Sequence, residues 1–126
     1  MNMQIKKIYL AGPIPTQNNW RENITKDLLK INKDLIVFNP EEFENTYSPA
    51  TIVNYDKSII IKCDLLIADI TRLSAGTSME ILFAWQNNIP VMLIANKEIN
   101  NPWLIYHSSF IVKNHKEARR ILKSIL

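Results

Sequence analysis

Hydrophobic residues in this chain gather in five short runs separated by longer segments of mixed polarity. The runs have the length of buried strands, and they predict strands at residues 7–11, 35–38, 65–68, 90–95 and 110–112. The segments between and after them have helical spacing and predict helices near residues 18–32, 50–62, 77–88, 103–106 and 115–126. Such alternation predicts an α/β fold with a five-stranded parallel sheet covered on both faces, in a single domain of residues 1–126.

The third run and the turn behind it form the centre of this pattern. Residues 65–68 are wholly apolar, as in a buried parallel strand, and Asp69 marks the end of that strand. A polar turn follows with Gly76, one of only two glycines in the chain. Glu80 is expected in the first turn of the next helix, where the helix dipole favours a carboxylate. Ligands of open α/β sheets bind at this edge of the sheet.

Several polar groups and glycines are predicted at the same sheet edge. They are Tyr9, Gly12, Asp56, Asp69, Ser74, Gly76, Thr77 and Glu80. The chain has no glycine-rich dinucleotide fingerprint, P-loop or Gly-x-Ser-x-Gly elbow. Its two histidines lack the spacing of metal ligands. The chemistry should therefore rest on carboxylates, and Asp56 and Glu80 form a nucleophile and acid/base pair of the kind that cleaves glycosidic bonds.

Composition limits the partners and the compartment. The net charge is +3, too mild to indicate nucleic acid, although an anionic small molecule fits. The single cysteine, Cys63, excludes an internal disulfide and suits a reducing compartment. No apolar stretch approaches the ~20 residues of a membrane span, and no signal peptide is recognisable. We expect a cytoplasmic protein without a membrane partner.

Two segments resemble the nucleoside 2-deoxyribosyltransferase family. Residues 9–13, Tyr-Leu-Ala-Gly-Pro, resemble the opening motif of that family, and residues 74–80, Ser-Ala-Gly-Thr-Ser-Met-Glu, resemble its nucleophile segment. Asp56 precedes Glu80 by the interval at which the family places its acid/base aspartate. The resemblance implies a flavodoxin-like, Rossmann-like three-layer sandwich, and it implies neither a metal nor an organic cofactor.

The resemblance also assigns roles. It implies that Glu80 attacks the anomeric carbon of a nucleoside or nucleotide, that Asp56 protonates the departing base, and that Tyr9 orients Glu80. It implies a homodimer or higher homo-oligomer, because the family builds its site at a subunit interface. The residues expected to contact substrate are Gly12, Ile14, Asp69, Ser74, Gly76, Thr77 and, from a neighbouring subunit, Ser109.

The sequence does not decide which acceptor receives the sugar, a second base or water. Transferases that act on nucleosides carry an aspartate six residues before the nucleophile, whereas the related nucleoside 5′-monophosphate N-glycosidases carry serine, as this chain does at Ser74. The arginine that the N-glycosidases have after their first strand is absent from residues 13–16. Two further alternatives are a nucleotide-binding sensor without turnover and a glycohydrolase of an ADP-ribose-type nucleotide.

Plainer structural roles compete with some of these assignments. Asp69 is equally suited to capping the turn after its strand, and Ser74 to forming a turn. The three tryptophans are expected in the core or at an interface. The basic residues of the last predicted helix, between 116 and 123, are expected on its solvent face.

Overall fold

The computed structural model describes residues 4–14, 18–42 and 47–126, and its strands form one parallel sheet in the order β2-β1-β3-β4-β5. The strands are β1 (Lys7–Ala11), β2 (Ile36–Phe38), β3 (Leu65–Asp69), β4 (Val91–Ile94) and β5 (Phe110–Val112). The helices are α1 (Trp20–Ile31), the short 3-10 helix η1 (Pro40–Glu42), α2 (Pro49–Ile60), α3 (Ala75–Gln86), α4 (Pro102–Tyr106) and α5 (His115–Ile125). This is the predicted flavodoxin-like α/β architecture.

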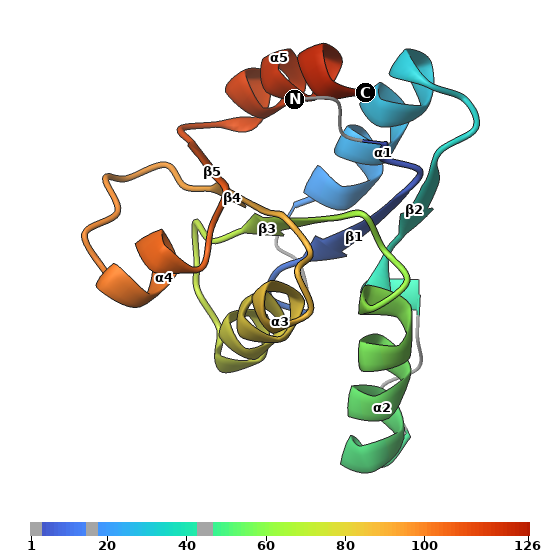
Figure 1. Cartoon of the computed structure of the whole chain (residues 1–126), viewed down its shortest axis with the longest axis vertical. Coiled ribbons are helices and arrows are strands. Elements are labelled where there is room, and N and C mark those ends of the chain that lie inside the picture. The colour runs from blue at the N-terminus through green and yellow to red at the C-terminus, as the bar shows by residue number, and fades with distance from the viewer. Residues whose placement is uncertain (1–3, 15–17, 43–46) are drawn as a thin grey trace.

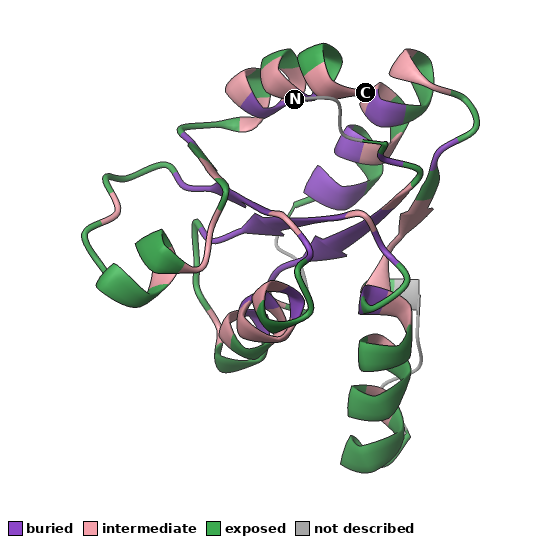
Figure 2. Ribbon diagram, in the orientation of Figure 1, coloured by how far each residue is buried: buried purple, intermediate pink, exposed green. Residues whose placement is uncertain are grey.

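The sheet is the middle layer of three (Figure 1). Helices α1 and α5 cover one face, where Ile24 and Leu28 of α1 share a core with Ala118 and Leu122 of α5. Helices α2 and α3 cover the other face, where Ile60, Ile81 and Ala84 pack on the sheet. Both faces of the central strands are therefore buried, as Figure 2 shows in purple, and this explains why β3 is apolar throughout its first four residues.

The sheet order locates the ligand edge. The chain moves outward from β1 to β2, and then returns to the other side of β1 to form β3, β4 and β5 in turn. The crevice at the carboxyl ends of β1 and β3 is thus the point where the strand order reverses, which is the usual ligand site in open α/β sheets.

The predicted elements match the observed ones closely, with one consequential shift. Strands β1 and β5 have the predicted bounds, but α3 begins at Ala75, two residues before the predicted start. Ser74 caps this helix: its side chain accepts a hydrogen bond from the backbone N–H of Thr77. Part of the polar loop predicted after β2 is the 3-10 helix η1. Residues 43–46 of that loop lie outside the described residues, as do residues 15 and 16 of the loop after β1.

Candidate functional site

A cavity of about 580 Å³ lies on the α2–α3 side of the sheet, within the size range of small-molecule sites. Its walls are residues of α2 and α3 together with the first residues after β1. Most of the side chains that line it are apolar, and the carboxylates among them are Asp56 and Glu80. The predicted site residues that line it are Gly12, Ile14, Asp56, Ser74, Gly76, Thr77 and Glu80.

The side chain of Glu80 is hydrogen-bonded to a residue of the first strand. The hydroxyl of Tyr9, a residue only 1% exposed on β1, donates a hydrogen bond of 2.5 Å to Oε2 of Glu80. Because α3 starts at Ala75, Glu80 lies in the second turn and not in the first turn as the sequence suggested. The dipole argument for Glu80 was therefore wrong, since the helix dipole acts mainly within the first turn.

The protonation of Glu80 is set by its surroundings. Burial raises its pKa to about 7, and the nearby charge of Asp56 adds to that rise. The hydrogen bond from Tyr9 and the positive charge of Arg21 act in the opposite direction and favour the carboxylate. Glu80 is thus poised to change protonation near neutral pH, a property common among catalytic groups.

Asp56 faces the same cavity from α2. Burial raises its pKa above the ordinary value of an aspartate. Two carboxyl groups in one largely apolar cavity disfavour each other's ionisation, so one of them tends to hold a proton while the other is charged. Enzymes that act on glycosidic bonds use such a pair, with one carboxyl group protonated and the other charged.

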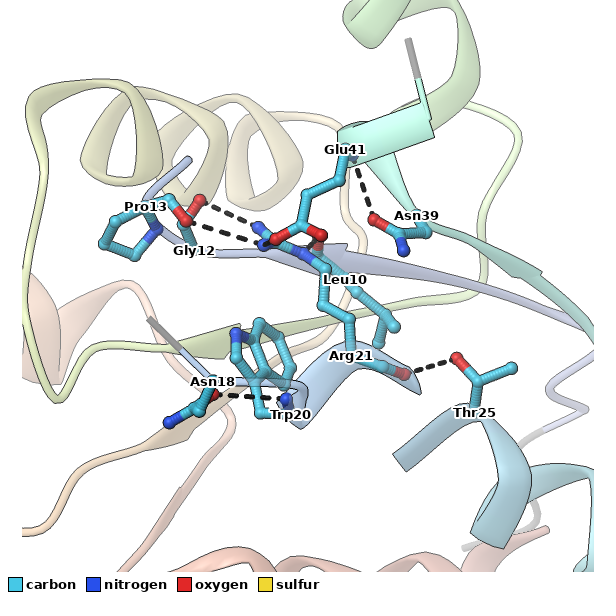
Figure 3. Close-up of polar contacts among 9 residues, drawn as sticks. All are labelled: Leu10, Gly12, Pro13, Asn18, Trp20, Arg21, Thr25, Asn39 and Glu41. Atoms are coloured by element: carbon cyan, nitrogen blue, oxygen red, sulfur yellow. Dashed lines mark hydrogen bonds and ion pairs between the residues drawn. The ribbon is translucent and has the colours of Figure 1, made fainter. Parts of the chain in front are cut away.

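Arg21 is a site component that the sequence analysis did not identify (Figure 3). Its side chain is only 1% exposed, and its guanidinium donates to the carbonyl oxygens of Gly12 at 2.8 Å and Leu10 at 3.3 Å. It also forms an ion pair with Glu41 of η1, with Nη1 to Oε1 at 2.7 Å. The loop after β1 and the turn after β2 are therefore fixed to α1 through one buried cation.

The structure leaves no room for a side chain at Gly12. A Cβ atom there would lie 3.0 Å from the Trp20 ring and 3.3 Å from the Arg21 guanidinium. The glycine therefore lets the loop close over these two residues of α1, which places its backbone at the cavity wall.

The N-terminus of α3 forms the polar end of the cavity. Ser74 and Thr77 are hydrogen-bonded to each other, with 2.8 Å between their hydroxyl oxygens, and Thr77 is almost fully buried. A Cβ at Gly76 would meet nothing within 4 Å, so this glycine leaves open space beside the helix start. Ser74 has a structural role, as the N-cap of α3 and not as the simple turn former considered from the sequence, and it also lines the cavity.

Three predicted site residues do not line this cavity: Tyr9, which reaches Glu80 from β1, and Asp69 and Ser109. The carboxylate of Asp69 accepts hydrogen bonds from the backbone N–H of Thr71 and from Nε2 of His115, both at 2.9 Å. Burial would raise the pKa of Asp69, but these bonds hold it below its usual value. Ser109 accepts a 3.4 Å bond from the backbone N–H of Val91, at the amino end of β4 and thus the opposite sheet edge. A contact of Ser109 with a neighbouring subunit's site stays a prediction.

Within residues 4–14, 18–42 and 47–126, no helix is long and apolar enough to cross a membrane. In the same part of the chain, no group of three or more histidine, cysteine, aspartate or glutamate side chains could hold a metal ion.

Solved structures of similar fold cover almost the whole chain. The 2-deoxyribosyltransferase of Bacillus psychrosaccharolyticus matches with a TM-score of 0.74 at 20% identity over 90% of each chain. The CMP N-glycosidase BcmB of Clostridium botulinum matches with a TM-score of 0.66 at 23% identity, over 96% of this chain and 100% of its own. A conserved protein of Enterococcus faecalis V583 matches with a TM-score of 0.73 at 18% identity, over 95% of this chain and 98% of its own.

The chain has the 2-deoxyribosyltransferase fold. The structural likeness expected from residues 9–13 and 74–80 is thereby confirmed at the level of the fold. No protein-family model matches the chain. No curated protein matches it either.

Proposed function

We propose that the protein cleaves the N-glycosidic bond of a nucleoside or nucleoside 5′-monophosphate through a covalent glycosyl–Glu80 intermediate. The observation that carries this proposal is the pair of carboxyl groups, Glu80 and Asp56, in one largely apolar cavity, with Glu80 oriented by Tyr9. The fold shared with a 2-deoxyribosyltransferase and a CMP N-glycosidase supports the same class of substrate.

The two carboxyl groups have different roles in the proposed reaction. The Glu80 carboxylate attacks the anomeric carbon, the carbon–nitrogen bond breaks with its electron pair going to the base, and Asp56 supplies the proton that the base takes up. An acceptor then gives a proton to Asp56 and attacks the same carbon, which releases the Glu80 carboxylate. The acceptor is a second base in a transferase and water in an N-glycosidase.

One incubation series distinguishes the alternatives. The protein is incubated with a panel of nucleosides and 5′-monophosphates, with and without added free base, and the products are separated by chromatography. Free base released without acceptor identifies a hydrolase, and base exchange only with acceptor identifies a transferase. Saturable binding of a nucleotide with no product in either condition contradicts the proposal and identifies a binding or sensor protein.

The pH dependence provides a test of the Tyr9–Glu80 bond. Because Glu80 must be ionised to attack, the rising acidic limb of kcat/KM against pH should have its midpoint near pH 7, the pKa that burial gives this group. At higher pH, kcat/KM should fall again as Asp56 loses the proton that the base needs. Tyr9→Phe removes a bond to the charged form, so the midpoint should move upward by roughly 1 to 2 pH units. Tyr106→Phe, at an exposed tyrosine, is the control. A midpoint that is the same in both variants would contradict the role of Tyr9.

A preference for 5′-monophosphates follows from the polar end of the cavity. Ser74, Gly76 and Thr77 line it at a helix N-terminus, which suits an anion. Ser74→Ala should raise KM for a monophosphate about tenfold to a hundredfold, the effect of losing one charge-assisted hydrogen bond, and leave KM for the nucleoside nearly unchanged. Loss of the helix cap alone would change both values alike, and that result would refute phosphate recognition by Ser74.

We also propose that the protein is a homo-oligomer. Helix α4 exposes Trp103 (71%), Tyr106 (68%) and Ile105 (47%), a set of large side chains more typical of an interface than of free surface. Light scattering at tens of micromolar should give the mass of a dimer or larger assembly, and Trp103→Asp should reduce it. A monomeric wild type under these conditions rules the proposal out.

A further inference from the structure

A second concave surface lies on the other side of the sheet, between α1 and α5. It has a volume of about 700 Å³ and does not share a residue with the cavity around Glu80. We call it the α1–α5 groove. The residues that line it are Asp27, Lys30, Ile31, Lys116, Arg119, Arg120 and Lys123.

The groove concentrates positive charge. Five cationic side chains face one carboxylate, a net of +4, whereas the whole chain has a net charge of +3. The rest of the protein is therefore slightly acidic, and the mild overall charge conceals a strongly basic site. Such a local field attracts anions far more than the average charge suggests.

Most of this charge is not neutralised within the protein. Arg119 and Asp27 form an ion pair across the groove, with 3.3 Å between Nη1 and Oδ2. Among the residues that the structure describes, Lys30, Arg120 and Lys123 have no ion-pair partner. The ion pair thus joins the two helices at one point and leaves the other cations available to a ligand.

The arrangement on α5 is unfavourable without a ligand. Lys116, Arg119, Arg120 and Lys123 have the spacing of one helical stripe, so like charges lie three and four residues apart, where they repel each other. Lys116 is also in the first turn, where the helix dipole disfavours a cation. Ala118 and Leu122 on the opposite stripe are buried against the sheet, so α5 cannot turn this charge away from the groove.

The geometry points to a bound polyphosphate: we propose that the α1–α5 groove binds a compact polyanion of the nucleoside triphosphate or tripolyphosphate class. A triphosphate carries about four negative charges at neutral pH, which matches the net charge of the groove. The volume suits a small molecule, and guanidinium groups bind phosphate oxygens through two parallel hydrogen bonds. Ile31 adds an apolar contact for a base, which a phosphate chain alone would not use.

Calorimetric titration of the purified full chain with inorganic tripolyphosphate tests this, because that probe has neither the sugar nor the base that the Glu80 cavity would bind. Ser74→Ala, which removes the proposed phosphate contact of that cavity, should leave the binding of tripolyphosphate unchanged. The wild type should show saturable binding that weakens as salt is raised. Arg120→Gln with Lys123→Gln should weaken it at least tenfold. Lys62→Gln with Lys97→Gln, which removes the same charge from exposed positions outside the groove, should change it less than twofold.

Each outcome bears on the proposal. Absence of saturable binding, or equal weakening in the two double variants, overturns it, provided both variants keep the wild-type circular dichroism spectrum. Tighter binding of a short DNA duplex or of anionic vesicles than of tripolyphosphate also overturns it. A nucleoside triphosphate that binds more tightly than tripolyphosphate, and loses that affinity in the groove variant, identifies a nucleotide as the ligand; equal affinities identify the phosphate chain alone.

Discussion

Replacing Glu80 with glutamine should lower kcat by about four orders of magnitude or more, because the glutamine amide cannot form the covalent bond to the sugar. Glutamine keeps the size of the side chain and can still accept a hydrogen bond from Tyr9, so the fold should be retained. The measurement is single-turnover cleavage of the best substrate from the panel. A mass increase equal to the sugar, found on the wild type and absent from the variant, would identify the intermediate.

The matched control is Glu98→Gln, the same chemical change at an exposed glutamate in the loop before α4. It should leave kcat unchanged within a factor of about two, as expected of a surface substitution. If Glu80→Gln retains turnover comparable to this control, Glu80 is not the nucleophile and the proposed mechanism is wrong.

Arg21→Met should lower the free energy of unfolding by about 3 to 5 kcal/mol, because it leaves two buried carbonyl oxygens without a donor, each at a cost of about 1 to 3 kcal/mol. The carbonyl oxygens of Leu10 and Gly12 would lose their donor, and Glu41 would lose its counterion. For a domain of this size, thermal unfolding should show a decrease in Tm of roughly 10 to 20 °C.

Arg119→Met provides the comparison for this prediction. Its ion pair with Asp27 joins side chains that are 42% and 30% exposed, so its loss should cost less than about 1 kcal/mol. A similar decrease in Tm for both variants would show that the buried contacts of Arg21 contribute no more than a surface pair does.

The sheet could be predicted from the sequence because its central strands are buried on both faces. The apolar run of β3, residues 65–68, lies between Asp64 and Asp69, so it defines the strand without ambiguity. The start of α3 was harder to predict, because Ser74 and Thr77 are both residue types that cap helices. The hydrogen bond from the backbone N–H of Thr77 to the Ser74 hydroxyl identifies Ser74 as the residue that precedes the helix.

The buried cation could not be predicted in the same way. In the sequence, Arg21 is one of several polar residues of an amphipathic helix, and such residues are usually exposed. Its main partners are backbone carbonyls, which every residue has and no sequence pattern distinguishes. The adjacent Trp20, expected in the core or at an interface, is indeed buried, whereas Trp103 is largely exposed on α4.

The position of β1 between β2 and β3 has a consequence for the order of folding. The Tyr9–Glu80 bond joins residues 71 positions apart, and β1 can pair with β2 long before β3 has been synthesised. During that interval one edge of β1 has backbone donors and acceptors without partners, which is the kind of edge that pairs with other chains. Regain of activity on refolding should therefore follow the pairing of β1 with β3, and until that step is complete the free edge of β1 can pair with another chain.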